Sequence, residues 1–448
     1  MKRTFVLIAC LCTLVVAGCT SDSKLPSATG KGSIRALNTI PASPDIRFLI
    51  EERLLGAISY QRSTAYARYD DFEYNFNFEL FLPGYAEPDR ILTITHKLET
   101  GRDDIFVLTG DPANPTVTIW STQAREWSDG DTVFQYQFAH TIVGQDDIDV
   151  YLDEAVEPAV LANKVATLSY GGVSNLSDTP EGTYIVTVTE AGDTNAILYQ
   201  SSVISFVSQT TQVISLLAGN ENDTSSIILN VMGSAGGDRK FPDASAVQTV
   251  RLIHASRALQ ASDIYDDDLL TSMVFSNLIF GNATGDIEVS DDPETYYYTP
   301  TGSIATILHQ ADYQVPTGRH ANLLVVGAAD DYSPYSFLPD RASVSAYAKV
   351  QLFNAALETT AVSVYIKDAD DPLVEEDFPL IFGLIYPAPS PIQPLLTGSY
   401  DVYVTPVGEK TVLAGPLRLD VVNGDVIDLI ALDTDTPGVV ELKVLPAP

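Results

Sequence analysis

The stretch Val250-Arg251-Leu252-Ile253-His254 decides the fold, because the sequence contains four versions of it. Each version is a short apolar strand that ends on a polar residue, and these final residues stand at positions 38, 140, 254 and 354. Self-similarity at a fixed period of this size indicates a tandem array of domains. The other three versions are Ile34-Arg35-Ala36-Leu37-Asn38, Tyr136-Gln137-Phe138-Ala139-His140 and Val350-Gln351-Leu352-Phe353-Asn354.

A second strand follows each version at a constant distance. Ten residues beyond the Asn or His stands an apolar residue, and an acidic turn follows it; the four apolar residues are Phe48, Val150, Ile264 and Val364. A strongly alternating strand comes later, at 182–188 and 398–404, and Tyr296 to Tyr298 hold that place in the third copy. Short alternating strands in units of about 100 residues are typical of Ig-like sandwiches.

We therefore expect an all-β protein of tandem Ig-like antiparallel β-sandwich domains that follow a lipoprotein signal peptide. Polar, Gly-rich or Pro-rich joints, including 233–246 and 338–345, favour a row of domains with partial flexibility. The expected ranges are 1–18 for the signal peptide, 19–32 for the lipidated cysteine and its tether, 33–122 for a divergent first sandwich, and 133–232, 248–340 and 346–446 for the other three.

The first eighteen residues have the pattern of a secretory signal. Lys2 and Arg3 precede an apolar run that is too short to span a bilayer, and the run ends in small residues before Cys19. This arrangement resembles a bacterial lipobox, which implies that Cys19 carries lipid. The residue after Cys19 is Thr20 and not the aspartate that resembles an inner-membrane retention signal. The expected location is therefore the outer membrane of a two-membrane bacterium, at its periplasmic face or the cell surface.

The copies resemble a bacterial domain-of-unknown-function family, number 4397. The residues that carry this resemblance are His254-Ala255-Ser256, Asp263-Ile264-Tyr265, Ile148-Asp149-Val150-Tyr151 and the Gly-Thr-Tyr strand at 182–184. It implies extracellular Ig-like sandwiches, in tandem and on lipoproteins, and it supplies no active site. Here Arg257-Ala258 replaces the Pro-Asp that the family favours after Ala-Ser.

Composition and motifs exclude several classes of function. The chain has 59 acidic and 25 basic residues, a net charge of −34, so nucleic acid is an unfavourable partner. Cys10 and Cys12 leave with the signal, so no disulfide framework remains. The five histidines lack zinc spacing, and no Gly-x-Ser-x-Gly elbow occurs. Since Asn and His share one slot in the four copies, that slot predicts a hydrogen-bonding role at a strand end rather than catalysis.

The leading hypothesis is a non-enzymatic cell-envelope lipoprotein that serves as a surface-attached binding or structural scaffold. Its expected partners are the membrane, through the N-terminal lipid, and a protein or glycan. A calcium-rigidified adhesin is the first alternative, because acidic turns can supply hard oxygen ligands. Its candidate ligands are Asp368, Asp370, Asp371 and Glu375. A carbohydrate-active envelope enzyme is the second, and no other cofactor is expected.

Overall fold

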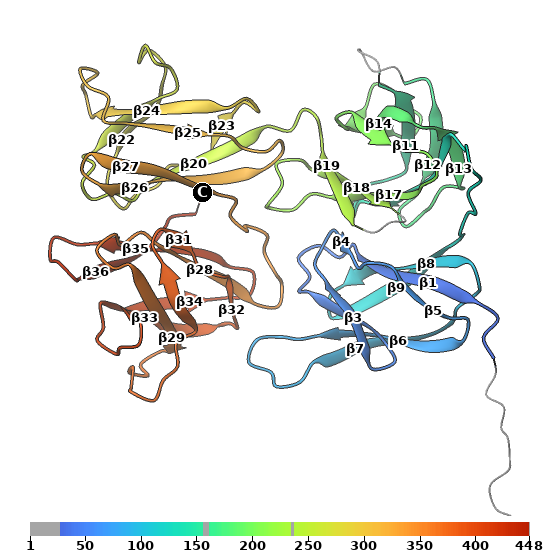
Figure 1. Cartoon of the computed structure of the whole chain (residues 1–448), viewed down its shortest axis with the longest axis horizontal. Coiled ribbons are helices and arrows are strands. Elements are labelled where there is room, and N and C mark those ends of the chain that lie inside the picture. The colour runs from blue at the N-terminus through green and yellow to red at the C-terminus, as the bar shows by residue number, and fades with distance from the viewer. Residues whose placement is uncertain (1–26, 156–160, 234–236, 448) are drawn as a thin grey trace, which may run out of the picture.

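The structure is a computed structural model that describes residues 27–155, 161–233 and 237–447 (Figure 1). Those residues form strands, turns and loops without a helix, and they build eight sheets. The predicted fold class, tandem β-sandwich domains, is confirmed. In the described ranges there is consequently no helix of the length and apolarity that a membrane span requires. Cys19 and the signal segment 1–18 lie outside the described residues.

The first sandwich lies between residues 31 and 123. One sheet holds β1 (Lys31–Asn38), β4 (Arg62–Ser63), β5 (Ala67–Asp70), β8 (Arg102–Asp111) and β9 (Asn114–Gln123). The other holds β2 (Ile46–Ile50), β3 (Arg53–Ile58), β6 (Glu73–Leu80) and β7 (Asp89–Lys97).

The second sandwich extends past the expected edge at 232. One sheet holds β10 (Val133–Thr141), β13 (Ser177–Pro180), β17 (Thr211–Ala218), β18 (Ile227–Gly233) and β19 (Asp238–Pro242). The other holds β11 (Ile148–Glu154), β12 (Lys164–Leu168), β14 (Gly182–Glu190), β15 (Ile197–Gln200) and β16 (Ile204–Phe206). Strand β19 lies in the stretch that the sequence assigns to a joint, and it pairs with β18 along its length.

The third sandwich has four strands in each sheet: β20 (Gln248–His254), β23 (Ile287–Val289), β26 (His320–Ala328) and β27 (Asp331–Phe337), then β21 (Ser262–Tyr265), β22 (Met273–Leu278), β24 (Glu294–Pro300) and β25 (His309–Tyr313). In the fourth, one sheet holds β28 (Ala348–Asn354), β31 (Ala388–Pro389), β32 (Gln393–Leu395), β35 (Val426–Asp433) and β36 (Val440–Val444). The other holds β29 (Ala361–Asp368), β30 (Ile381–Ile385), β33 (Gly398–Pro406) and β34 (Ala414–Val421).

All four sandwiches share one topology. The repeated strand at the start of each copy pairs in parallel with a late strand: β1 with β8, β10 with β17, β20 with β26, and β28 with β35. The other strand pairs of the eight sheets are antiparallel. In the divergent first copy, β6 pairs with β2 as β14 pairs with β11 in the second. It is therefore the counterpart of the Gly-Thr-Tyr strand.

The repeated first strands are buried on both faces. Ile34 and Ala36 point into the core of the first sandwich, whereas Leu37 packs with Trp120 and Met232 in an apolar cluster that joins the first and second sandwiches. In the same way, Ile253 and Phe353 belong to a cluster that joins the third and fourth. A sheet covered on both sides explains why these strands are almost continuously apolar in sequence.

One position of the repeated strand alternates between two residue types. It is Arg35 in the first copy and Arg251 in the third, but Gln137 and Gln351 in the second and fourth. Both arginines are almost fully buried. Arg35 Nη2 donates to the carbonyl of Gly233 at 3.0 Å, and Arg251 Nη2 donates to that of Pro446. Arg35 thus reaches the end of β18 in the second sandwich, and Arg251 reaches the residues just after β36 in the fourth. The two pairs of domains therefore use the same kind of interface.

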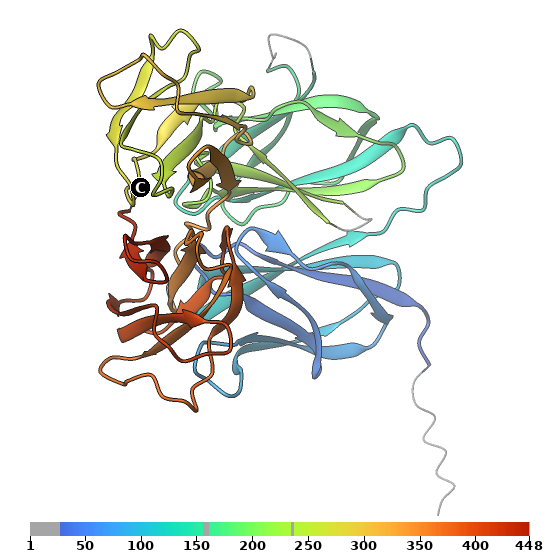
Figure 2. The ribbon, with the colours of Figure 1, turned by 60° about the vertical axis from the view of Figure 1, so that its left-hand side comes forward.

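The four sandwiches do not form a row. They lie at the corners of a closed four-membered arrangement, and the views in Figures 1 and 2 agree on it. Contacts between distant parts of the chain hold it closed: Ser345 N donates to the carbonyl of Ala42, and Asp223 and Arg319 form a β-bridge. The expected row is wrong because its joints are themselves hydrogen-bonded. Asn222, for example, accepts from the backbone N–H groups of Arg341 and Ala342 in the 338–345 joint.

Candidate functional site

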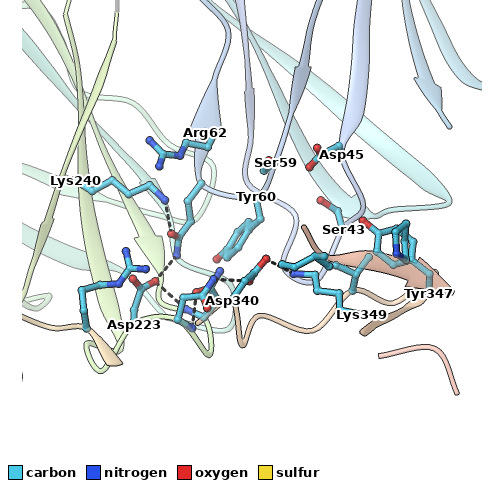
Figure 3. A pocket seen from close by; sticks show the side chains of 17 residues that line it. Ser43, Asp45, Ser59, Tyr60, Arg62, Asp223, Lys240, Asp340, Tyr347 and Lys349 are labelled. Carbon is cyan, nitrogen blue, oxygen red and sulfur yellow. Dashed lines mark hydrogen bonds and ion pairs between the residues drawn. The ribbon is translucent and has the colours of Figure 1, made fainter. Parts of the chain in front are cut away.

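A polar pocket lies where all four sandwiches meet (Figure 3). Its volume is about 470 Å³, which is within the usual range for small-molecule sites. Its wall comes from segments more than 300 positions apart in sequence. The lining residues are Ser43, Asp45, Ser59, Tyr60, Gln61, Arg62, Asn220, Asn222, Asp223, Lys240, Arg319, Asp340, Val344, Tyr347, Lys349, Ile392 and Pro394.

The turn between β3 and β4 supplies the centre of this wall. Gln61 takes a positive φ of 62°, a conformation unusual for a residue with a side chain, and is buried. Its Nε2 donates to the carbonyl of Ala218 at 2.7 Å and to Asp223 at 3.3 Å. The Tyr60 hydroxyl donates to the same carbonyl at 2.8 Å. Burial raises the pKa of Tyr60 well above its ordinary value, so the phenol remains a donor. These bonds fasten the first sandwich to the second.

Lys240 on β19 reaches this turn from the second sandwich. Its Nζ donates to Gln61 Oε1 at 2.9 Å, as Figure 3 shows. Burial lowers the pKa of Lys240 to about 8; Arg62 and Arg319 add repulsion, which Asp223 and Asp238 partly oppose. Both carboxylate oxygens of Asp238 already accept hydrogen bonds from Ser63, at 2.7 and 2.6 Å. The ammonium at neutral pH is thus held in an environment with too little negative charge.

Asp340 and Lys349 close the opposite side of the pocket. Lys349 Nζ donates to Asp340 Oδ2 at 2.8 Å, and Asn222 Nδ2 donates to Asp340 Oδ1 at 2.9 Å. Burial acts to raise the pKa of Asp340, but these bonds and the charge of Lys349 outweigh it, and the pKa is lower than usual. This ion pair is internally satisfied. Tyr347 lies beside it, and burial together with Asp45 and Asp340 raises its pKa to about 12.

The residues of the strand-end slot have the structural role that the sequence predicts. Asn38, His140, His254 and Asn354 are fully buried. Asn38 Oδ1, His140 Nδ1 and Asn354 Oδ1 each accept the backbone N–H two residues later, at 3.0 to 3.2 Å. His254 Nε2 lies 3.3 Å from the carbonyl of Gln260. Asn38, His140 and Asn354 thus make the hydrogen bond expected of this slot, whereas His254 Nδ1 has no hydrogen-bond partner among the described residues.

The structure does not bring the four candidate calcium ligands together. Asp371 and Asp370 pair with Lys367 at 3.1 Å and with Arg418 at 2.6 Å, while Asp368 ends β29 and Glu375 lies on an exposed loop. No cluster of three or more His, Cys, Asp or Glu side chains suitable for a metal occurs in residues 27–155, 161–233 and 237–447. Asp370 and Asp371 form salt bridges at a hairpin tip instead.

Sequence reasoning missed every residue of the central pocket. The charged residues Arg62, Asp223, Lys240 and Arg319 share no motif, and only the closed arrangement of domains places them together. Lys240 lies in the stretch interpreted as a flexible joint. The sequence did offer one signal, because a chain this acidic contains few basic residues. That several of them gather at one pocket is visible only in the folded structure.

Comparisons with known proteins add little to this description. No protein-family model and no curated protein matches the chain. Among solved structures, one titled "The Bacillus anthracis TIE protein" aligns over 91% of this chain and 70% of that chain, at 10% sequence identity and a TM-score of 0.15. A similarity at this TM-score supports no argument about fold or function. The resemblance to family number 4397 therefore stays a prediction, and the function has to be argued from the sandwiches and their shared pocket.

Proposed function

We propose that this protein is a non-enzymatic, lipid-anchored binding scaffold of the bacterial cell envelope, whose ligand occupies the pocket among the four sandwiches. The observation that carries the proposal is the composition of that pocket. A cavity of about 470 Å³ has polar and charged side chains from all four domains, whereas the two clusters that join neighbouring sandwiches are apolar. Convergent polar groups in a concave site are a mark of ligand binding.

Asp340 of the pocket is poorly suited to the acid step of glycoside hydrolysis. A hydrolase needs one carboxyl group with a raised pKa to act as the proton donor. The pKa of Asp340 is instead lowered, because Lys349 and Asn222 stabilise its charged form. This supports a scaffold role and places the enzyme alternative second. Turnover of an envelope polymer that is lost in Asp340→Asn would reverse the order.

The test of ligand binding is a melting screen of the fragment from Thr20 to Pro448 against small envelope-derived compounds. A ligand of the pocket raises Tm with its concentration, because it binds only the folded, closed form. The expected hit loses its effect in Asn222→Ala, which changes the pocket, and keeps it in Asn195→Ala, a control on an exposed turn of the second sandwich. A screen without any pocket-dependent hit would contradict the proposal.

The anchor is tested separately in the full chain expressed in a two-membrane bacterium. We expect the wild type to incorporate labelled palmitate and to sediment with the outer membrane. Cys19→Ala is expected to lose both properties, and Cys12→Ala, inside the apolar run, is the matched control. Membrane association of unlabelled Cys19→Ala would contradict lipid anchoring. Attachment through one cysteine is sufficient when more than one acyl chain is present.

A further inference from the structure

We infer that the central pocket binds an oxyanion, a carboxylate, sulfate or phosphate group, between Arg62, Lys240 and Arg319. This inference rests on the proposed function and names the chemical class of its ligand. The three cations come from three elements: β4 of the first sandwich, β19 of the second, and the turn that precedes β26 of the third. Figure 3 shows Arg62 and Lys240 on the same side of the pocket, the side on which Asp223 also lies.

These three cations are not neutralised by neighbouring carboxylates. In the described part of the chain, none of them forms an ion pair within 4.0 Å. Arg319 Nε is shielded from solvent and has no hydrogen-bond partner there. A buried donor without a partner destabilises the folded state. That the fold keeps Arg319 Nε buried without a partner supports a role for this arginine in binding a ligand.

The pocket contrasts with the rest of the protein in how its charges are paired. The chain carries 59 acidic residues against 25 basic ones, so most basic side chains have acidic neighbours available. Three carboxylates at or beside the pocket are already committed: Asp238 to Ser63, Asp340 to Lys349 and Asn222, and Asp223 to Gln61 and the backbone of Asn220. The exposed Asp45, which also lines the pocket, lies on the side of Tyr347, away from Lys240 (Figure 3). Three uncompensated cations remain, and a bound oxyanion would accept hydrogen bonds from each.

The ionisation of Lys240 also favours a bound anion. The groups that face Lys240 are Gln61, Arg62, Asp223, Asp238 and Arg319, and burial together with the two arginines lowers its pKa to about 8. An oxyanion between the three cations removes this repulsion and favours the ammonium form. Affinity for the anion is therefore expected to fall as the pH rises from 7 to 9, since the free protein loses the ammonium charge over that interval.

The experiment compares a matched pair of sugars, glucuronate and glucose, together with inorganic phosphate and sulfate, by calorimetric titration of the fragment from Thr20 to Pro448 at constant ionic strength. We expect at least one of the three anions to bind and glucose not to bind. Arg62→Gln and Arg319→Gln should each weaken that binding about tenfold, the ordinary effect of a lost charged hydrogen bond. Arg53→Gln, an exposed arginine of the same sandwich outside the pocket, is the control and should leave affinity unchanged.

The outcomes separate the anion inference from the proposed function. Binding of glucuronate alone identifies the anion as a carboxylate, and binding of phosphate or sulfate identifies a tetrahedral one; either result supports the inference. Anion binding that Arg62→Gln and Arg319→Gln leave unchanged overturns it. Glucose binding that is lost in Asn222→Ala also overturns it, but leaves the pocket as a ligand site. Absence of binding by all four probes overturns the inference, and the melting screen then decides the proposed function independently.

Discussion

At the scale of single residues, Lys240 illustrates the opposition between stability and binding. Its ammonium is buried near Arg62 and Arg319, which lowers its pKa to about 8, whereas a lysine in an unfolded chain titrates near 10.4. Between these two values the unfolded state binds more protons, so stability rises with pH from about 8 to about 10.4. At neutral pH the charged lysine therefore destabilises the fold. Residues that reduce stability in this way are common at functional sites.

We predict that Lys240→Met stabilises the protein at pH 7 by about 1–3 kcal/mol, because methionine fills the same space without a buried charge. The gain should be largely lost by pH 10.5, where the lysine is neutral in the folded state and about half neutral in the unfolded state. Denaturant unfolding at pH 7 and pH 10.5 checks the prediction, with the exposed Lys97→Met as control. A loss of stability at pH 7 would show that the hydrogen bond to Gln61 outweighs the repulsion.

The strand-end slot gives a second prediction at this scale. His140→Asn should be tolerated, because Asn38 and Asn354 make the same bond to the backbone N–H two residues on. His140→Leu should lower the free energy of unfolding by about 1–3 kcal/mol, since the N–H of Ile142 then stays buried without its acceptor. Chemical unfolding of both variants is the measurement. Equal losses would indicate that the imidazole itself is required.

At the scale of elements, sequence periodicity predicts the central strands of each sheet well but predicts an edge strand such as β19 poorly. Phe48, Val150, Ile264 and Val364 lie in the sandwich cores as their repeated spacing indicates. Spacing could not assign β19, because its sequence, Asp238 to Pro242, lacks alternation and its stability comes from pairing with β18. Nor could it explain the Arg and Gln alternation at positions 35, 137, 251 and 351, which reflects contacts between domains.

The acidic hairpin tips give a prediction for the calcium hypothesis. Asp370, Asp371 and Asp377 are paired with Arg418 or Lys367, and the hydrogen bond from Lys367 lowers the pKa of Asp377. Calcium would have to displace these cations, so we expect millimolar calcium to leave Tm unchanged relative to magnesium. A rise of several degrees that is lost in Asp370→Asn would revive the calcium-rigidified alternative.

At the scale of the whole molecule, the pair of sandwiches is the natural unit. Residues 27–244 contain two sandwich cores and the apolar cluster that joins them. Residues 245–447 likewise contain two sandwich cores and a joining cluster. The closed arrangement could not be predicted from the sequence, because it depends on contacts such as Ser345 with Ala42 that no local pattern encodes.

We predict that fragments 27–244 and 245–447 each fold, whereas fragment 27–131 aggregates. The cut at 244 passes between pairs, but the cut at 131 exposes Leu37, Ile105, Val107 and Trp120, which are buried against the second sandwich. Gel filtration and thermal unfolding check this expectation. A monomeric, cooperatively folded 27–131 would show that the interface between the first two sandwiches is dispensable.

A ligand in the shared pocket would also have a mechanical effect on the molecule. A ligand that four domains grip together is also a cross-link between chain segments far apart in sequence. At a free concentration one hundred times its Kd it would add about 2.7 kcal/mol to the closed form. A load that pulls the two halves apart would expel the ligand, and a ligand in excess would resist the load. The molecule would therefore resist extension more strongly when occupied than when empty.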